Sequence, residues 1–327
     1  MRKGQSGFMT GLELSRRYYE ECGRPMLERE FPDLLPLLAI GAVGSGSDRY
    51  GFDDELSRDH DFEPGFCLFL PGEDVVDRRQ AFLLERAYAK LPKEFSGFRR
   101  QPLSPVGGNR NGVLRTAEFY TFATGDPEGQ LTVEQWLLLP DSGLAESVNG
   151  EVFFDEYGEF SAIRKRLSHM PEDIRKKRMA GNLLLMGQAG QYNLSRCLRR
   201  GEIEAAQLAC NEFVNAALKV IFLLRRKYAP YYKWSFRALR ALEGTEEYAR
   251  LLSSVLTGDL RCADTAENKL HAVERLAVLI CEELRKDGIS GTDGNRLEQI
   301  AYSVNDSVEN GEIRNLSIFA AVSSPVL

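Results

Sequence analysis

Two short polar motifs near the N-terminus could together bind a phosphorylated ligand. The first, Gly44, Ser45, Gly46 and Ser47, follows a continuous apolar run over residues 37–43, which has the length of a buried strand. Glycine allows close approach to the backbone, so the amides and the two hydroxyls of such a turn can hold phosphate oxygens. An ordinary turn is the alternative. The motif lacks the last glycine of a dinucleotide fingerprint and the lysine of a P-loop.

The second motif, Asp59-His60-Asp61, could bind a divalent cation. On an extended chain Asp59 and Asp61 point to the same face, with their Cα atoms roughly 7 Å apart, while His60 points away. Two carboxylates at that spacing repel each other, and a cation bound between them removes the repulsion. Carboxylate oxygens suit Mg²⁺, which typically takes substrate phosphates as further ligands. A solvated acidic loop is the alternative, because other acidic residues lie on both sides.

The composition argues against several classes of protein. With 3 histidines, the chain lacks the ligands of a zinc site or of a multi-histidine metal phosphohydrolase. The net charge of -6 gives no overall attraction to nucleic acid or anionic lipid, so we expect no bulk nucleic-acid binding and no membrane partner. The 6 cysteines form no C-x-x-C pair and are interpreted as reduced core thiols. Because no transmembrane or signal segment is apparent, we expect a cytoplasmic protein.

The elements that must position these motifs fall into two contrasting parts. The chain of 327 residues is long enough for two domains. Strand-like apolar segments lie at residues 37–43, 67–70, 113–122 and 151–155, with helical segments between them. After residue 162 helical periodicity dominates, which is typical of a bundle. We therefore predict an α+β protein, with a mixed-sheet domain over residues 1–162 and a helical bundle over residues 163–327.

The two motifs and their spacing resemble the nucleotidyltransferase superfamily of the polymerase-β type. The pattern of that superfamily is a hydrophobic residue, Gly, Gly or Ser, a spacer, and then acidic residues alternating with hydrophobic ones. V-G-S followed by D-H-D-F fits this pattern. The stretches GFDDELSRDHDFEPGFCLFL and KYAPYYKWSFRAL are similar to an uncharacterised bacterial family assigned to the superfamily. The resemblance spans most of the chain and implies a nucleotidyltransferase-like fold for the first domain.

The resemblance also implies roles for individual residues. The Gly-Ser turn matches the phosphate-binding turn, and Asp59 and Asp61 match the metal-binding carboxylates. The implied reaction is in-line attack of an acceptor hydroxyl on the α-phosphorus of a nucleoside triphosphate, with two Mg²⁺ ions and departing pyrophosphate. A third carboxylate would lie on a following strand, where Glu118 is the candidate. The sequence departs from the pattern at the histidine of the acidic motif and at Pro64-Gly65 after it.

The helical part carries a second candidate group in KYAPYYKWSFRAL. Lys233 and Arg237, one helical turn apart, could hold the triphosphate while Tyr232 stacks on the base. The alternative is an aromatic corner between two helices, with its cations extending into solvent. A basic run, IRKKR at residues 174–178, is interpreted as a solvated helix face, with contact to a polyanionic substrate as its alternative.

Together these features favour a Mg²⁺-dependent nucleotidyltransferase that moves a nucleoside monophosphate from a nucleoside triphosphate to a hydroxyl acceptor. A small hydroxylated molecule is the first choice of acceptor because the chain is acidic. A protein or the end of a tRNA stays open as the acceptor. The rival hypothesis is a non-catalytic nucleotide sensor or interaction module that retained the phosphate-binding turn. The sensor hypothesis is favoured by the weakness of the third-carboxylate candidate.

Overall fold

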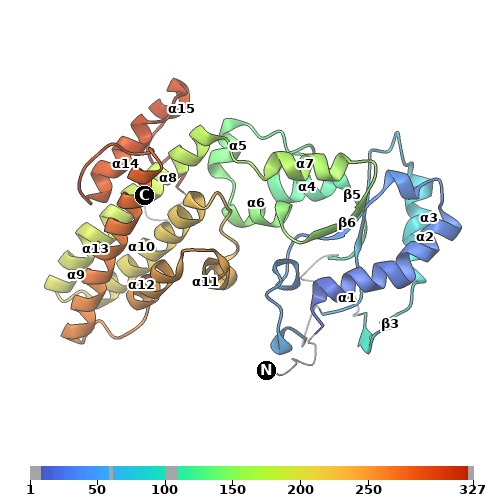
Figure 1. Cartoon of the computed structure of the whole chain (residues 1–327), viewed down its shortest axis with the longest axis horizontal. Helices are drawn as coiled ribbons and strands as arrows, with labels where there is room; N and C mark the ends of the chain where they lie inside the picture. The colour runs from blue at the N-terminus through green and yellow to red at the C-terminus, as the bar shows by residue number, and fades with distance from the viewer. Residues whose placement is uncertain (1–8, 59–61, 101–109, 323–327) are drawn as a thin grey trace. The chain divides into compact units, whose positions relative to one another are not determined.

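The computed structural model describes residues 9–58, 62–100 and 110–322 (Figure 1). The chain divides into two compact units. The first comprises residues 1–131 and 143–169, and the second comprises residues 132–142 and 170–327. The first unit contains the strands and the second is helical, so the α+β class is confirmed. The boundary expected after residue 162 falls inside helix α7 (Glu159–Leu167).

A four-stranded sheet forms the centre of the first unit. Its order is β5-β2-β1-β6, in which β1 is antiparallel to β2 and β6, while β2 and β5 are parallel. The strands are β1 (Ala39–Ala42), β2 (Cys67–Leu70), β5 (Gly112–Arg115) and β6 (Glu151–Asp155). The register pairs Gly41 with Cys67, Cys67 with Gly112, and Ala42 with Glu151. The end of β1 therefore lies beside the starts of the other three strands.

Helices cover both faces of this sheet (Figure 1). Leu68 and Leu70 of β2 pack into one core with residues from the N-terminal helices and α3, whereas Phe69 packs on Phe119 and Phe160 of the opposite face. The first face is formed by α1 (Gly11–Tyr18), the π-helical turn η1 (Tyr19–Gly23), α2 (Arg24–Glu30) and α3 (Arg78–Ala89). The second face is formed by α4 (Thr116–Thr124), α6 (Asp141–Val148) and α7. The alternation of side chains along β2 thus separates two packed layers.

The strand predicted over residues 113–122 is wrong in its second half. β5 ends at Arg115, whose Nη1 donates to the carbonyl oxygens of Pro71 and Val76, each at 2.7 Å. From Thr116 the chain is helical, and Gly125 ends α4 in the left-handed conformation with φ 78°. Because Phe and Tyr suit strands and buried helix faces alike, their presence did not distinguish the two structures. The predicted strand at residues 151–155 agrees with β6.

Short elements connect the sheet to its helices. The chain that follows α3 contains a small hairpin of β3 (Glu94–Phe95) and β4 (Phe98–Arg99). The apolar segment after Thr132, whose sequence is compatible with helix or strand, is helix α5 (Val133–Leu138). Thr132 and Gln135 form a capping box at its start, which fixes the helical choice.

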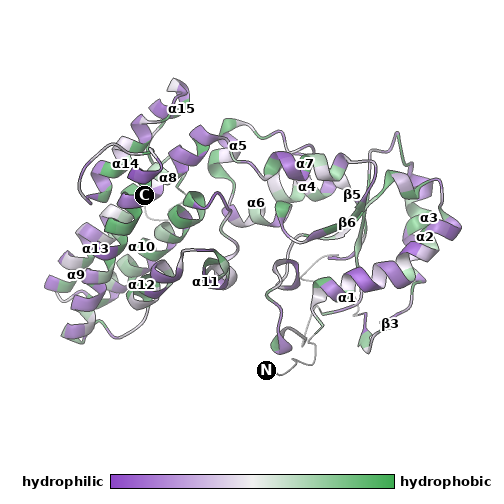
Figure 2. Ribbon diagram, viewed as in Figure 1, coloured by the Kyte–Doolittle hydropathy of each residue, from purple (hydrophilic) through white to green (hydrophobic). Residues whose placement is uncertain are grey.

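The second unit is a bundle of helices with an apolar interior (Figure 2). Helix α8 (Glu172–Met186) continues through a π-helical segment, η5 (Gly187–Leu194), into α9 (Ser195–Arg199). The other helices are α10 (Ile203–Leu224), α11 (Tyr232–Ala241), α12 (Glu246–Leu256), α13 (Ala263–Lys286), α14 (Leu297–Asp306) and α15 (Gly311–Asn315). By length and composition α10 could cross a membrane, but 67% of its apolar window is buried in the protein, as in a central bundle helix.

Arg175, Lys177 and Arg178 of the basic run at residues 174–178 are buried, which corrects the interpretation of the run as a solvated face. Lys177 has no exposed surface, and its Nζ donates to three oxygens, Asn305 Oδ1 at 2.7 Å, Arg314 O at 3.0 Å and Leu316 O at 2.7 Å. Burial lowers the pKa of the Lys177 ammonium. The cation therefore holds the C-terminal segment onto α8.

Arg178, the next residue, fastens the 132–142 segment to the same helix. Its Nη1 donates to Trp136 O at 2.9 Å, and its Nη2 lies 3.1 Å from both Leu139 O and Asp141 Oδ1. Both members of the Arg178–Asp141 ion pair are buried, and the added carbonyl contacts satisfy the remaining donors. This contact explains why residues 132–142 belong to the helical unit.

Candidate functional site

The Gly-Ser turn begins where β1 leaves the sheet. Gly44 and Gly46 have φ angles of 96° and 119°, which residues other than glycine rarely adopt. Asn149 fixes the turn, because its Nδ2 donates to Gly44 O at 2.7 Å and its Oδ1 accepts from Gly44 N at 2.8 Å. The turn continues into a short 3-10 helix, η3 (Asp48–Tyr50).

The backbone of this turn leaves a row of donors without acceptors. Within the described ranges, the consecutive amides of Ser45, Gly46, Ser47 and Asp48 donate no hydrogen bond. The amides of Tyr50 and Phe52, in contrast, both bond to Ser47 O, at 3.2 and 2.8 Å. Consecutive unpaired amides in a glycine-containing turn form a concave surface that suits an anion. Ser45 is exposed and its neighbours are partly exposed, so water or a ligand can reach these amides.

Arg110 supplies a positive charge beside the turn. Its Nε and Nη2 donate to Ser45 O at 3.1 and 2.9 Å, and Nη2 lies 2.5 Å from Asp48 Oδ1. A Cβ atom at Gly46 would lie 1.8 Å from Arg110 Nη2, so the guanidinium occupies space that only glycine leaves open. Sequence reasoning missed Arg110 because residues 92–112 resemble a surface connection. Its position just before a strand could have indicated this role, since β5 starts at the same end of the sheet at which β1 ends.

A buried arginine links the turn to the chain that follows the acidic motif. Arg49 is 2% exposed, and its Nη2 donates to Asn111 Oδ1 at 2.7 Å. Asn111 Nδ2 in turn donates to Glu63 Oε1 at 3.3 Å, and the Asn111 side chain packs where a Cβ of Gly65 would lie. Residues 62–66 enter β2 at the sheet end where β1 leaves. The network therefore ties three segments of the site together.

The predicted metal ligands Asp59 and Asp61 lie outside the described residues. Within the described residues, no group of three or more His, Cys, Asp or Glu side chains is arranged to hold a metal ion. Asp48, the carboxylate nearest the turn, is paired with Arg110 and lies 3.5 Å from Arg49 Nη1. The described residues alone therefore do not fit a metal, and a metal site here depends on Asp59 and Asp61.

Two other titratable groups at this end of the sheet are shifted toward their neutral forms. Burial raises the pKa of the Cys67 thiol to about 11, and its Sγ donates to Arg110 O at 3.1 Å. Burial also raises the pKa of Glu146, while Arg110 opposes that shift. Because a thiol with this pKa is protonated at neutral pH, Cys67 is a packing residue and not a nucleophile.

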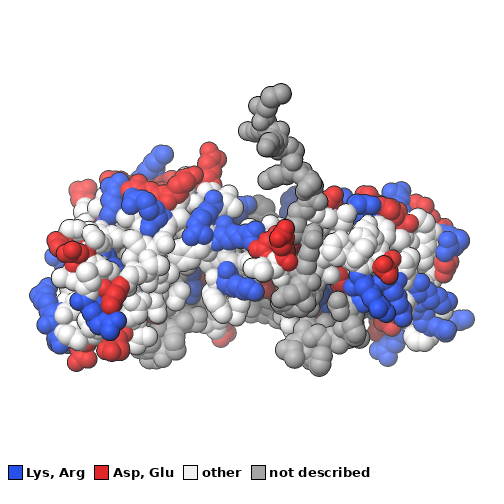
Figure 3. Space-filling view, turned by 90° about the horizontal axis from the view of Figure 1, so that it is seen from below, with Lys and Arg blue, Asp and Glu red and all other residues white. Residues whose placement is uncertain are grey.

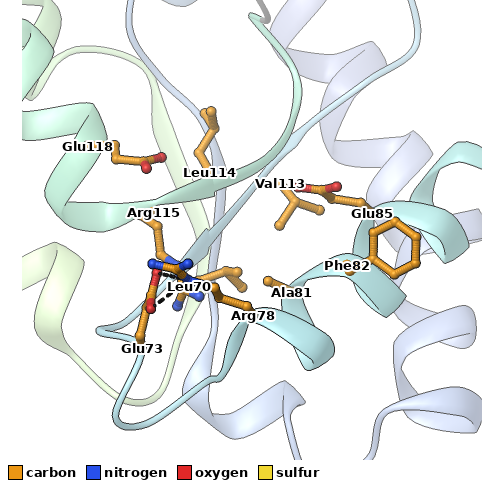
Figure 4. Close-up of a pocket in the computed structure, with 10 residues that line it drawn as sticks. All are labelled: Leu70, Glu73, Arg78, Ala81, Phe82, Glu85, Val113, Leu114, Arg115 and Glu118. Carbon is orange, nitrogen blue, oxygen red and sulfur yellow. Dashed lines mark hydrogen bonds and ion pairs between the residues drawn. The ribbon is translucent and has the colours of Figure 1, made fainter.

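The prediction that Glu118 lies on a strand is wrong. Glu118 is exposed in the first turn of α4 and lines an open pocket with Leu70 and Arg115 (Figure 4). Leu70 and Arg115 are paired at the ends of β2 and β5 away from the Gly-Ser turn. The structure thus associates Glu118 with a different surface of the first unit.

Tyr232, Lys233 and Arg237 belong to α11 in the second unit. All three are exposed, and Tyr232 retains 75% of its surface. The Lys233 ammonium lies 5.0 Å from the ring centroid of Trp234, which is a cation–π distance. The helix buries Ser235 and Leu239. Tyr232, Lys233 and Arg237 are therefore accessible to solvent, whereas Phe236 packs against the core of the unit.

The comparisons with known proteins give a family model that matches the middle of the chain and a solved structure that is similar over most of it. Residues 136–235 match a family model described as "Domain of unknown function (DUF4037)". This range begins in α5 and ends in α11, so it includes parts of both units. The match agrees with the resemblance of the sequence to an uncharacterised family. No curated protein matches this chain.

One solved structure, a nucleotidyltransferase-like protein from Exiguobacterium sibiricum, is similar to this chain with a TM-score of 0.37 and 11% identity. The similarity covers 88% of this chain and 89% of that chain.

Proposed function

We propose that this chain is a nucleotidyltransferase that binds the phosphates of a nucleoside triphosphate at the Gly-Ser turn. The observation that carries the proposal is the row of amides from Ser45 to Asp48, which donate to no acceptor among the described residues and lie next to the guanidinium of Arg110. Backbone donors fixed in position lose no side-chain entropy on binding an anion. Arg110 adds a charged donor, which strengthens hydrogen bonds to phosphate oxygens.

The proposed binding step exchanges one anion for another. Arg110 is paired with the Asp48 carboxylate in the described structure, and a phosphate oxygen can take the same donors. Asn149 and the Arg49–Asn111 network hold the surrounding backbone, so the amides stay in place when the ligand arrives. The chain's own contribution to transfer is thus to bind and orient the triphosphate.

The proposal includes Mg²⁺ held by Asp59 and Asp61. When bound, the ion would offset negative charge on the phosphates. We do not assign Glu118 as a further ligand, because it lines a pocket at the other end of β2 and β5. Asp59→Asn and Asp61→Asn are expected to abolish pyrophosphate release from a nucleoside triphosphate. Unchanged release in either variant would refute the metal assignment.

The phosphate site is tested by calorimetry on the full chain with ATP, CTP, GTP and UTP, each with and without Mg²⁺. Arg110→Gln should weaken triphosphate binding at least about ten-fold, whereas Arg110→Lys should retain part of the affinity. Arg79→Gln is the matched control, because Arg79 is exposed on α3. Ser45→Ala and Ser161→Ala form a second pair, since both serines are exposed in the same unit. If all five variants bind the triphosphate with the affinity of the wild type, the Gly-Ser turn is not the binding site.

Tyr232, Lys233 and Arg237 remain proposed contacts to the base and the triphosphate. Their exposure on α11 supports the proposal, because a ligand can reach all three. Lys233→Gln should lower triphosphate affinity, while Lys227→Gln, at an exposed position outside α11, should leave it unchanged. The same titrations address the non-catalytic alternative. Tight binding without pyrophosphate release, across hydroxylated small molecules, proteins and tRNA as acceptors, would identify a nucleotide sensor.

A further inference from the structure

In the described part of the chain, β5 is an edge strand of the sheet. Within the described residues it pairs only with β2. Gly112 N donates to Phe66 O at 2.9 Å, on the β2 side. Because the N–H and C=O groups of successive residues point to opposite sides of a strand, both groups of Val113 and the N–H of Arg115 point away from β2. The open edge therefore offers main-chain donors and an acceptor.

A cavity lies directly beside this edge (Figure 4). Its volume is about 340 Å³, and it is bounded by Phe82 and Glu85 of α3, by β5, and by Glu118 of α4. An added strand needs free space along the edge, and this cavity supplies it. The sequence of β5, Gly-Val-Leu-Arg, contains no proline, which would remove a main-chain donor from the edge.

The two faces beside the edge carry the same combination of side chains. Val113 pairs with Leu68 and so lies on the α3 face, while Leu114 pairs with Phe69 and lies on the α4 face. On α3, Phe82 is 55% exposed and Glu85 follows it by three positions. On α4, Phe122 is 92% exposed and Glu118 precedes it by four positions. Residues at these spacings share one side of a helix, so each face presents an exposed aromatic ring beside a carboxylate.

Among the described residues that line the cavity, Glu85 and Glu118 carry the unpaired charge, while Arg86, outside the lining, lies over the Phe82 ring at 5.8 Å from its centroid. Glu73 is paired with Arg78 at 2.9 Å, and the Arg115 guanidinium is bonded to two backbone carbonyls. Glu85 and Glu118 form no hydrogen bond or ion pair within the described part of the chain. In the charge view, acidic and basic side chains are intermixed over the face shown (Figure 3). A partner that covers the edge would therefore meet two free carboxylates, one on each side.

We propose that β5 binds an extended segment of another protein, which adds to the sheet as a fifth strand and presents one apolar and one basic side chain on each of its two faces. Main-chain hydrogen bonds to Val113 would give affinity, and side chains on the two faces would give specificity. On each face an apolar residue contacts the exposed ring and a lysine or arginine pairs with the carboxylate. The proposal does not depend on the phosphate site, which lies at the opposite end of β2 and β5.

The probe is the peptide fluoresceinyl-Thr-Val-Ile-Lys-Lys-Thr-amide, labelled on its N-terminal nitrogen, titrated into the full chain and followed by fluorescence anisotropy. In this sequence each face of the peptide carries one apolar residue and one lysine. Two control peptides separate the contribution of the lysine side chains from that of the main-chain hydrogen bonds. The first replaces both lysines with glutamate, and the second is methylated on alternate backbone nitrogens and cannot form main-chain bonds. Both controls should bind at least about ten-fold more weakly than the probe.

The protein variants test the location. The double substitution Glu85→Lys and Glu118→Lys should weaken the lysine probe at least about ten-fold and strengthen the glutamate peptide. The double substitution Glu94→Lys and Glu156→Lys, at two exposed positions of the same unit, is the control for the same change of net charge. Val113→Pro removes a donor on the open side without removing a bond to β2, and should also abolish binding. The charge-reversal pair keeps the proposal testable if the proline variant does not fold.

Three results would overturn the proposal. The first is that the lysine probe does not bind, and the second is that it binds the wild type and the charge-reversal variant equally. The third is a concentration-dependent dimer in sedimentation that Val113→Pro disrupts, because the edge would then pair with a second copy of this chain. Binding that is lost on both charge reversal and backbone methylation supports the proposal.

Discussion

Asn149 bonds to Gly44 through both polar groups of the glycine backbone, at 2.7 and 2.8 Å. The side-chain amide does for Gly44 what a neighbouring strand would do, at the point where β1 has left the sheet. Asn149 directly precedes Gly150, where a Cβ would lie 2.0 Å from Ala42 O. The start of β6 therefore approaches the end of β1 closely and holds the turn in place.

Replacing Asn149 tests whether this pair of bonds holds the anion-binding amides in position. Asn149→Ala leaves the partly buried N–H and C=O of Gly44 without partners, so we expect a loss of ~1–3 kcal/mol in the free energy of unfolding. Phosphate or triphosphate affinity should fall as well. Chemical denaturation and calorimetry measure the two effects. A variant with full stability and full affinity would show that the turn is fixed by other contacts.

Two glycines beside the site should respond differently to alanine. At Gly51 the φ angle is 66° and a Cβ atom would meet no other atom within 4 Å, so Gly51→Ala should cost only the ~1 kcal/mol of a left-handed alanine. At Gly46 the φ angle is 119° and a Cβ atom would lie 1.8 Å from Arg110. Gly46→Ala should therefore be the more destabilising change and should also weaken anion binding. Equal melting temperatures for the two variants would contradict this ranking.

The buried ammonium of Lys177 should be a major contributor to the stability of the second unit. Lys177→Met leaves three oxygens without their donor, and we expect the free energy of unfolding to fall by ~2–4 kcal/mol. Lys286→Met, at an exposed position at the end of α13, should change stability by less than ~0.5 kcal/mol. Urea denaturation compares both variants with the wild type. A small effect at Lys177 would mean that water replaces the ammonium.

Glu172 should make a contribution to stability that depends on pH. A hydrogen bond from Arg175, with a further one from Arg226, lowers the pKa of Glu172 to about 2. Because the folded pKa is below the unfolded value, the contribution is complete above about pH 5 and is lost as the pH falls toward 2. Glu172→Gln should thus be less stable than the wild type at pH 7, by ~1 kcal/mol given the partial exposure of Glu172, and the gap should narrow at pH 3. If the difference in stability between the variant and the wild type is the same at pH 7 and pH 3, ionisation of Glu172 is not its cause.

The strands of the sheet were largely predictable from sequence, because buried strands appear as short apolar runs. Residues 37–43, 67–70 and 151–155 contain β1, β2 and β6. The segment 113–122 was mistaken because its aromatic residues are compatible with both structures. Its helical half is decided by packing against Phe160 and by the left-handed Gly125, and the first of these is a tertiary contact.

The partners of the candidate site were not predictable from local patterns. The Gly-Ser turn is visible in the sequence, but Arg110 and Asn149 reach it from 65 and 105 positions away. Only the order of the strands brings these residues to the end of β1. The basic run at 174–178 was misjudged for the same reason, since the oxygens that bind Lys177 lie 128 to 139 positions further along the chain.

The path of the chain limits how this protein can be divided. It passes from one unit to the other after residues 131, 142 and 169, so neither unit is a single continuous piece. A fragment that ended at residue 162 would carry α5 without the Arg178 that fastens it, and would expose Trp136 and Leu137, which are otherwise 6% and 4% accessible. We therefore do not expect either piece of a chain divided at residue 162 to fold on its own. A substitution that disrupts α5 should also destabilise the helix α8 that carries Arg178.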